Sequence, residues 1–375
     1  MSGRSVTLPR WVDIAAIPLT NVLLAFLVAG LIVLAIGENP LEATRIMISG
    51  ALGSGEGIGY TLYYTTNYIF TGLAVAFAFH AGLFNIGGEG QAYIGGLGVT
   101  LVLLAFDHSL PFAVLLPLAV LAAMLFGALW VLIPAYLQAY RGSHIVITTI
   151  MFNFLASALM VYLVVNVLTP VGATEPATRD FTAESAIPFV HEILGRFGIA
   201  MDSTPLNLSI LLALIACLFV WLYLWHTPWG YELRAFGHSE KAAIYAGVKT
   251  RRIILITLCI SGALAGLVGV NEIMGVQHRL ILNFTAGYGF AGIAVALMGR
   301  NHPVGIVLAS LLFGVLSQGG AELSFENPAI TRDMTVVIQG LVILFSGALV
   351  HLTRPWFERL FAFILSRRNA LPQEA

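Results

Sequence analysis

Long apolar runs separated by short polar segments dominate the chain from residue 14 to residue 353. A helix needs about 20 apolar residues to cross the hydrocarbon core of a membrane. Ten runs fit this description to differing degrees: 14–36, 60–80, 90–106, 111–134, 145–169, 206–226, 253–275, 287–299, 304–319 and 334–353. They are too long and too uniformly apolar for barrel strands, and in lipid only helices and closed barrels satisfy the backbone.

The pattern therefore predicts an all-α, polytopic transmembrane bundle of about ten helices. The runs 287–299 and 304–319 are short, so we expect them to be tilted, half-buried or broken. The first run, 14–36, lacks a convincing cleavage site with small residues, and we expect a retained helix rather than a secretory signal.

Composition excludes several classes of protein. Apolar residues make up 58% of the chain and charged residues 10%, against about 45–50% and about 25% in soluble domains. The mean hydropathy of +0.90 agrees, so neither an ordinary soluble enzyme nor a disordered chain fits. The only two lysines, Lys241 and Lys249, do not follow a glycine, which excludes a P-loop for ATP. Cys217 and Cys259 lie in apolar runs and are interpreted as small buried hydrophobic residues.

The placement of charge predicts the orientation in the membrane. With the N-terminus in the cytoplasm and alternating runs, 13 of the 18 basic residues fall inside and five outside. The inner ones are Arg4, Arg10, Arg141, Arg234, Lys241, Lys249, Arg251, Arg252, Arg300, Arg354, Arg359, Arg367 and Arg368. Basic residues concentrate on the cytoplasmic side of membrane proteins. Both termini, 1–13 and 354–375, are therefore expected in the cytoplasm, flanking a transmembrane domain over 14–353.

Two loops are longer than simple connectors. Residues 170–205 form a polar outer loop, in which 187–197 could be a short helix on the membrane surface. Residues 227–252 form the longest inner loop and hold five of the 13 inner basic residues. Here Ser239 is a suitable cap for a short helix and Gly247 a suitable end. Small residues along this helix would let another protein approach closely, although a plain positive connector remains the alternative.

Residues 79–93 join two apolar runs without an ordinary polar loop. Four glycines interrupt the helix there, and the polar residues Asn85, Glu89 and Gln91 lie among or beside them. Unwound backbone at membrane depth is tolerated only where it is buried in protein or lines a cavity, and transporters place such breaks at the substrate path. We therefore take Phe84, Asn85, Glu89 and Gln91 as substrate-path candidates. The alternatives are a packing role, or a tight cytoplasmic turn with Glu89 in water.

Other polar residues lie within apolar runs. Asn153 is a further substrate-path candidate, but a buried asparagine is more often an interhelical hydrogen-bond partner. Glu272, beside Asn271, is expected to reach the outer interface and water. The stretches 72–77 and 292–297 resemble each other, which is weak evidence for an internal repeat. A sharp inner turn is predicted at 299–303, with Pro303 starting a helix.

Catalytic and metal-binding patterns are not evident. The nine histidines are scattered, none with a spacing such as HExxH, and no nucleophile stands beside a base. We therefore predict a transport protein with no catalytic residues and no metal site, rather than a membrane enzyme.

Several motifs, in one order, resemble those of a known family. They are GLFNIGGEGQ (82–91), ITTIMFN (147–153), GYELRAFG (230–237) with the residues 240–247 that follow it, and GIAVALMGRNHP (292–303). The chain resembles, over about residues 12–355, permease subunits of bacterial ABC importers for nucleosides and simple sugars. This group lies within the branched-chain amino acid and sugar permease superfamily.

The resemblance implies a translocation path for nucleosides in the bacterial inner membrane. It implies four partners: a second permease, a cytoplasmic ABC ATPase, a substrate-binding lipoprotein or periplasmic protein, and the lipid bilayer. Nucleic acid is not an expected partner. No cofactor is expected on this chain, since the partner ATPase uses the ATP. Ribose-like sugars or branched-chain amino acids are alternative substrates, and an ion-coupled secondary transporter is the alternative of another class.

The inner loop looks like the coupling helix that docks into the ATPase of such importers. The residues to which this role is assigned are Arg234, Gly237, Glu240, Ala242, Ala243 and Gly247. One departure matters: Lys241 is inserted into the glutamate-alanine-alanine pattern of other importers. Individual contacts are therefore not carried over from them.

Overall fold

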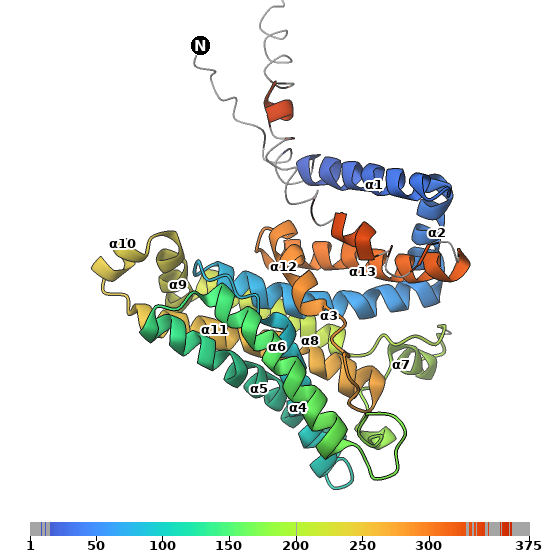
Figure 1. Ribbon diagram of the computed structural model, residues 1–375, viewed down its shortest axis with the longest axis horizontal. Coiled ribbons are helices and arrows are strands. Elements are labelled where there is room, and N and C mark those ends of the chain that lie inside the picture. Colours follow the sequence, from blue (N-terminus) through green and yellow to red (C-terminus); the bar gives the residue numbers. More distant parts are fainter. Residues whose placement is uncertain are drawn as a thin grey trace, which may run out of the picture. The chain divides into compact units, whose positions relative to one another are not determined.

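The computed structural model describes residues 16–199 and 201–327, with residues 9, 12, 330, 331, 334, 336–341, 344, 353, 355–359 and 361 beyond them. Most of the expected cytoplasmic ends, 1–13 and 354–375, and much of the tenth predicted run, 334–353, lie outside the described residues. In the described part the chain is helical, with two isolated antiparallel bridges and no strand (Figure 1). The predicted all-α, polytopic architecture is confirmed.

Two compact parts make up the chain, and each is described by itself. The larger comprises residues 51–318, and the smaller joins 1–50 to 319–375. The helices of the larger part are α3 (Gly55–Phe79), α4 (Gly88–Phe106), α5 (Phe112–Arg141), α6 (Ile145–Leu163), α7 (Val190–Arg196), α8 (Ser209–His226), α9 (Pro228–His238), α10 (Glu240–Tyr245), α11 (Thr250–Gly266), α12 (Tyr288–Met298) and most of α13 (Pro303–Glu326).

Six spans in the described chain are long and apolar enough to cross a membrane. They are Gly88–Phe106, Phe112–Arg141, Ile145–Leu168, Ser209–His226, Thr250–Gln277 and Pro303–Glu326. Each corresponds to a predicted run. The helix α12 is short, as expected, with 11 residues. The helix α13 has 24 residues and is not short, because it continues past 319 through a more polar stretch.

The helix α3 lies inside the larger part. It has 25 residues, and every residue from 65 to 78 is buried. A Cβ at Gly72 would lie 2.8 Å from a methyl of Val295, and one at Gly292 would lie 2.6 Å from Thr71. The two similar stretches, 72–77 and 292–297, therefore pack against each other where α3 crosses α12. Small residues allow such close crossings between membrane helices.

Two helices run into π-helical segments, which often occur at functional sites. The segment η2 (Val164–Leu168) extends α6, and η4 (Val270–Gln277) follows α11 within the span Thr250–Gln277. The η4 segment turns Asn271 and Glu272 into the protein, where each side chain is only 1% exposed. The expectation that Glu272 reaches water at the outer interface is therefore wrong.

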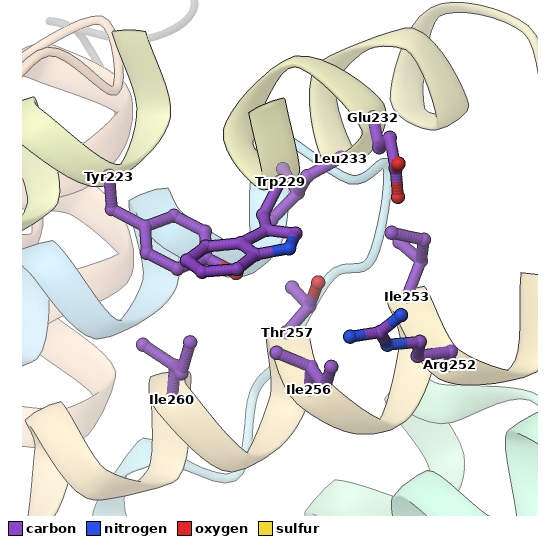
Figure 2. Close-up of a pocket in the computed structure, with 9 residues that line it drawn as sticks. All are labelled: Tyr223, Trp229, Glu232, Leu233, Arg252, Ile253, Ile256, Thr257 and Ile260. Carbon is purple, nitrogen blue, oxygen red and sulfur yellow. The ribbon is translucent and has the colours of Figure 1, made fainter. Parts of the chain in front are cut away.

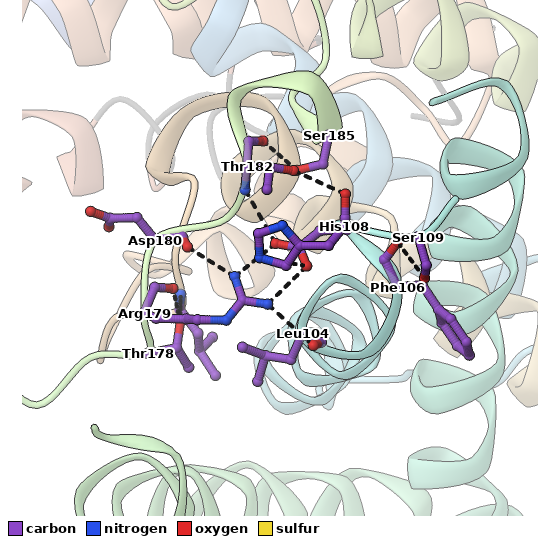
Figure 3. A network of polar contacts seen from close by, with 11 residues as sticks. Leu104, Phe106, His108, Ser109, Thr178, Arg179, Asp180, Thr182 and Ser185 are labelled. Atoms are coloured by element: carbon purple, nitrogen blue, oxygen red, sulfur yellow. Dashed lines mark hydrogen bonds and ion pairs between the residues drawn. The ribbon is translucent and has the colours of Figure 1, made fainter. Parts of the chain in front are cut away.

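The outer loop, 170–205, is anchored at two places. Arg179 donates to both carboxylate oxygens of Asp107, at 2.7 and 2.8 Å, and to the carbonyl oxygen of Leu104 at 3.2 Å (Figure 3). The backbone N–H of Ile187 donates to the carbonyl oxygen of Met274 at 3.1 Å. The helix α7 lies within the predicted short helix 187–197. The loop is therefore tied both to the end of α4 and to η4.

The smaller part contains α1 (Ile17–Ala35) and most of α2 (Pro40–Leu52), joined by a sharp bend of 119°. Together these helices form a broken span or a re-entrant loop by length and composition. Helix α2 is not among the predicted runs, because its sequence mixes polar and apolar residues. Asn327 donates to Glu38 at 2.7 Å.

Candidate functional site

The inner loop forms two short helices, α9 and α10, at the end of the larger part opposite α7 (Figure 1). Ser239 Oγ accepts from the N–H of Ala242 at 3.4 Å, which is the predicted cap. Gly247 follows α10 at φ +86°, where glycine avoids the cost of a left-handed conformation. The predicted helix with its cap and its end is confirmed.

The surface of α10 is largely exposed and partly apolar. Tyr245 is 96% exposed and Ile244 53%, whereas Ala243 is buried against the rest of the loop. Of the remaining coupling candidates, Glu240, Ala242, Gly247 and Gly237 are exposed, and Arg234 is half-buried. Exposed aromatic and aliphatic side chains on a protruding helix are typical of a surface that binds another protein.

The end of α9 touches the end of α3. A Cβ at Gly237 would collide with the carbonyl oxygen of His80, the residue that follows α3. The His80 ring in turn lies 2.9 Å from the carbonyl oxygen of Asn301, in the predicted inner turn. The ring of Trp225, at the end of α8, packs edge-on against His80. We call His80, Trp225, Gly237 and Asn301 the inner junction.

The broken segment 79–93 is held by its own amides. Asn85 Nδ2 donates to Gln91 Oε1, and Gln91 Nε2 donates to Asn85 Oδ1, both at 3.0 Å. Asn85 Nδ2 also donates to Ser261 Oγ, on α11, at 2.9 Å. The structure thus brings Asn85 and Gln91 together in a buried pair. Phe84 lies apart from them, half-buried, with its ring against Phe79.

Asn153 braces the same segment from α6. Its Oδ1 accepts from the N–H of Gly90 and its Nδ2 donates to the carbonyl oxygen of Ile86, both at 2.9 Å. One side chain therefore pairs with two backbone groups of the broken segment. The sequence motif ITTIMFN thus meets the motif GLFNIGGEGQ in space.

Glu89 binds the start of α12. Its carboxylate accepts from Thr285 Oγ1 at 2.6 Å and from the N–H groups of Gly287 and Gly289 at 3.0 and 2.7 Å. A carboxylate is stabilised at a helix N-terminus by the free N–H groups and the helix dipole. The half-buried Glu89 therefore binds protein groups and not water alone.

A buried polar network lies between α3 and η4, and the sequence alone pointed only to Asn271 and Glu272 among its members. Glu272 Oε1 accepts from Tyr63 Oη and from Asn67 Nδ2, both at 2.6 Å. Asn271 Nδ2 donates to Asn67 Oδ1 at 2.9 Å, and Asn207 Nδ2 donates to Asn271 Oδ1 at 3.0 Å. These five residues, Tyr63, Asn67, Asn207, Asn271 and Glu272, offer a carboxylate, amides and a phenol in the bundle interior.

The signal for this network was present in the sequence. Tyr63 and Asn67 are four residues apart and so share one face of a helix. A carboxylate inside an apolar span is a functional hypothesis by default. Only the three-dimensional arrangement joins these elements. Among the described residues, no group of His, Cys, Asp and Glu could hold a metal ion.

A family model described as the permease component of a branched-chain amino acid transport system matches residues 57–347. The guanosine ABC transporter permease protein NupP of Bacillus subtilis (strain 168) is 37% identical over 88% of this chain and 92% of that protein. The nucleoside ABC transporter permease protein NupB of Lactococcus lactis subsp. cremoris (strain MG1363) is 33% identical over 88% and 89%.

The glucose ABC transporter permease protein TsgB13 of Haloferax volcanii is 35% identical over 98% of this chain and 95% of that protein. Bacillus subtilis and Lactococcus lactis each hold a second matching permease, NupQ and NupC, named for guanosine and for nucleosides. No solved structure matches the chain significantly.

Proposed function

The chain belongs to the family of branched-chain amino acid transport system permease components, and we propose that it carries nucleosides as one half of a bacterial ABC importer. Membership makes it a multi-pass transport subunit rather than an ATPase. Its location in the bacterial inner membrane, with both termini in the cytoplasm, is part of the proposal.

The observation that carries the nucleoside substrate is the buried polar network. A nucleoside needs donors and acceptors for its base edge and ribose, and aromatic or apolar surface for its base. The Glu272 carboxylate and the amides of Asn67, Asn207 and Asn271 supply donors and acceptors. The ring of Tyr63 supplies aromatic surface. Relatives named for guanosine and nucleosides support this choice. The residues 84–91 would then position the helices that line the path.

The partners follow from the permease role. Two relatives come from organisms that hold a second matching permease with a related name, which supports a pair of permeases here. An ATPase would use the ATP and would dock on α9 and α10, through Arg234, Gly237, Glu240, Ala242, Ala243 and Gly247. A binding lipoprotein or periplasmic protein would deliver the substrate to the outer loop. The lipid bilayer is the fourth proposed partner.

Uptake by the complete importer tests the proposal. The chain is produced together with its proposed ATPase, second permease and binding protein, in cells that lack their own nucleoside uptake. We expect accumulation of labelled guanosine or uridine that excess unlabelled nucleoside abolishes and glucose or leucine does not. An inactive ATPase variant is the matched control. Competition by glucose instead would overturn the assignment of nucleosides as substrates. Uptake driven by an ion gradient alone would overturn the assignment to an ABC importer.

A further inference from the structure

Basic side chains gather where α5 ends and α11 begins. A cavity of about 610 Å³ lies there, lined by Tyr140, Lys249, Thr250, Arg251, Arg252, Leu255 and Ile256. Arg251 lies over the Tyr140 ring, 4.8 Å from its centroid. In the described part of the chain, the three cations Lys249, Arg251 and Arg252 form no ion pair with a carboxylate. The cavity thus holds three positive charges without a negative one.

An apolar cavity adjoins the basic one and shares Arg252 and Ile256 with it. It measures about 210 Å³ and lies between α8, α9 and α11 (Figure 2). Tyr223 and Trp229 line it together with aliphatic side chains, as Figure 2 shows: Leu233, Ile253, Ile256 and Ile260. Glu232 is the one acid that lines either of these two cavities, and it forms no ion pair with Arg252.

The surface that continues from the basic cavity toward the middle of α5 is apolar and exposed. Ile133 is 53% exposed and Tyr136 is 47% exposed. The Tyr136 ring stacks on that of Tyr140, with the ring centroids 4.8 Å apart. Tyrosines are enriched where a membrane helix meets the headgroup layer. In the proposed orientation, the cations would therefore lie at headgroup level on the inner side, with an apolar face beside them.

We propose that this pair of cavities binds an anionic glycerophospholipid of the inner leaflet. The phosphate would lie against Lys249, Arg251 and Arg252, and part of an acyl chain would occupy the apolar cavity beside Trp229. Basic pockets between membrane helices on the cytoplasmic side suit anionic headgroups, because the charges attract and the helices supply apolar walls. The joined cavities match a molecule that is charged at one end and apolar at the other. A soluble anion would leave the apolar cavity empty.

Native mass spectrometry of the purified importer tests this site. Phosphatidylglycerol and phosphatidylcholine with the same acyl chains are titrated against the wild type, against R251A/R252A, and against the control R45A/R196A. The control removes two exposed arginines that line neither cavity and form no ion pair with a described residue. We expect phosphatidylglycerol to bind about tenfold or more weakly to R251A/R252A only.

Two results would overturn the lipid site. An equal loss of phosphatidylglycerol binding in both double variants would mean that the total charge of the protein attracts the lipid. Equal binding of phosphatidylglycerol and phosphatidylcholine would show that the site has no preference for an anionic headgroup. Excess inorganic phosphate is added as a third arm, and displacement of the lipid by phosphate at matched concentration would indicate a site for a free anion.

Fluorescence gives a second readout, in which recovery by a variant that keeps the charge distinguishes loss of the site's charge from unfolding. Phosphatidylglycerol with brominated acyl chains should quench the emission that Trp229 contributes, measured as the difference between wild type and Trp229→Phe. We expect this quenching to vanish in R251A/R252A and to return in R251K/R252K, which keep the charge. Absence of Trp229 quenching in the wild type would refute the placement of the acyl chain.

Discussion

Gly237, near the end of α9, packs directly against the carbonyl oxygen of His80, the first residue after α3. The element proposed to dock on the ATPase thus contacts the end of the most deeply buried helix. That contact lies within the broken segment 79–93, in which Gly82 follows His80 by two residues at φ +69°. A displacement of α9 would therefore reach α3 and the break together.

Replacing Gly237 by alanine should disturb this contact. The added methyl has no room beside His80, and overpacking costs about 1–3 kcal/mol. We expect Gly237→Ala to lower nucleoside uptake severalfold and to loosen the dependence of ATP hydrolysis on the binding protein. Gly195→Ala, where no atom lies within 4 Å of the new methyl, is the control. Normal uptake with normal coupling would show that the inner junction accommodates the added methyl.

Two substitutions of Glu272 should distinguish a structural role of its carboxylate from a role in binding substrate. Glu272→Ala leaves the Tyr63 hydroxyl and the Asn67 amide without their acceptor, and each buried unpaired group costs about 1–3 kcal/mol. We expect a clear drop in the thermal unfolding midpoint. Glu272→Gln keeps an acceptor oxygen, so stability should change less while the KM for guanosine rises about tenfold. An unchanged KM in a stable Gln variant would exclude substrate contact.

The control for this series is Glu42→Gln, at an exposed position on α2. It removes the same charge at a site where no substrate contact is proposed. Its unfolding midpoint and KM should both match the wild type.

Glu89→Ala should reduce uptake while the importer still assembles. The variant frees Thr285 and two N–H groups at the start of α12, and loss of such a cap costs about 1–2 kcal/mol. Uptake and co-purification with the second permease are measured together. Glu89→Gln should restore part of the activity, because one oxygen still accepts. Failure of the Ala variant to insert into the membrane would assign Glu89 to folding instead.

Acid should release the outer loop from α4. The hydrogen bonds from Arg179 hold the pKa of Asp107 below its ordinary value, which is about 3.9. Because the pKa of Asp107 is lower in the folded state than in the unfolded state, the ionised carboxylate stabilises the fold fully above about pH 3.9. This stabilisation is lost as the pH falls through the lowered pKa of the folded state. Once exchange is corrected for the intrinsic rate at each pH, the amides of residues 170–187 should therefore be protected at pH 5 and lose protection near pH 3.

Asp107→Asn is the matched variant for the acid experiment. It lacks the titrating group, so its loop should exchange faster at pH 7 as well and respond less to acid. A wild-type loop whose exchange follows the same course as that of the variant would show that the Asp107–Arg179 pair does not anchor it.

The apolar runs were sufficient to predict the spanning helices, because length and hydropathy alone decide which segments can cross a membrane. Helix α2 escaped this test, since its mixed sequence has no long apolar run. The cap at Ser239 and the end at Gly247 were predictable because they depend on neighbouring residues only.

The pairing of distant polar residues was not predictable. Tyr63 and Glu272 are 209 positions apart, and nothing in the sequence indicates that a π-helical segment turns Glu272 toward α3. The partners of Glu89 on α12 were missed for the same reason. For Asn153 the expected interhelical hydrogen bonds are confirmed, although its partners, in the segment 86–90, required the fold.

The crossing of α3 and α12 at Gly72 and Gly292 has a consequence for the history of the protein. Each glycine faces a side chain of the other helix, so a larger residue at one position demands a smaller neighbour on the other. The two stretches should therefore change together during evolution. Chimaeras that exchange α3 between relatives without α12 should fail, whereas those that exchange both as one inherited block should remain active.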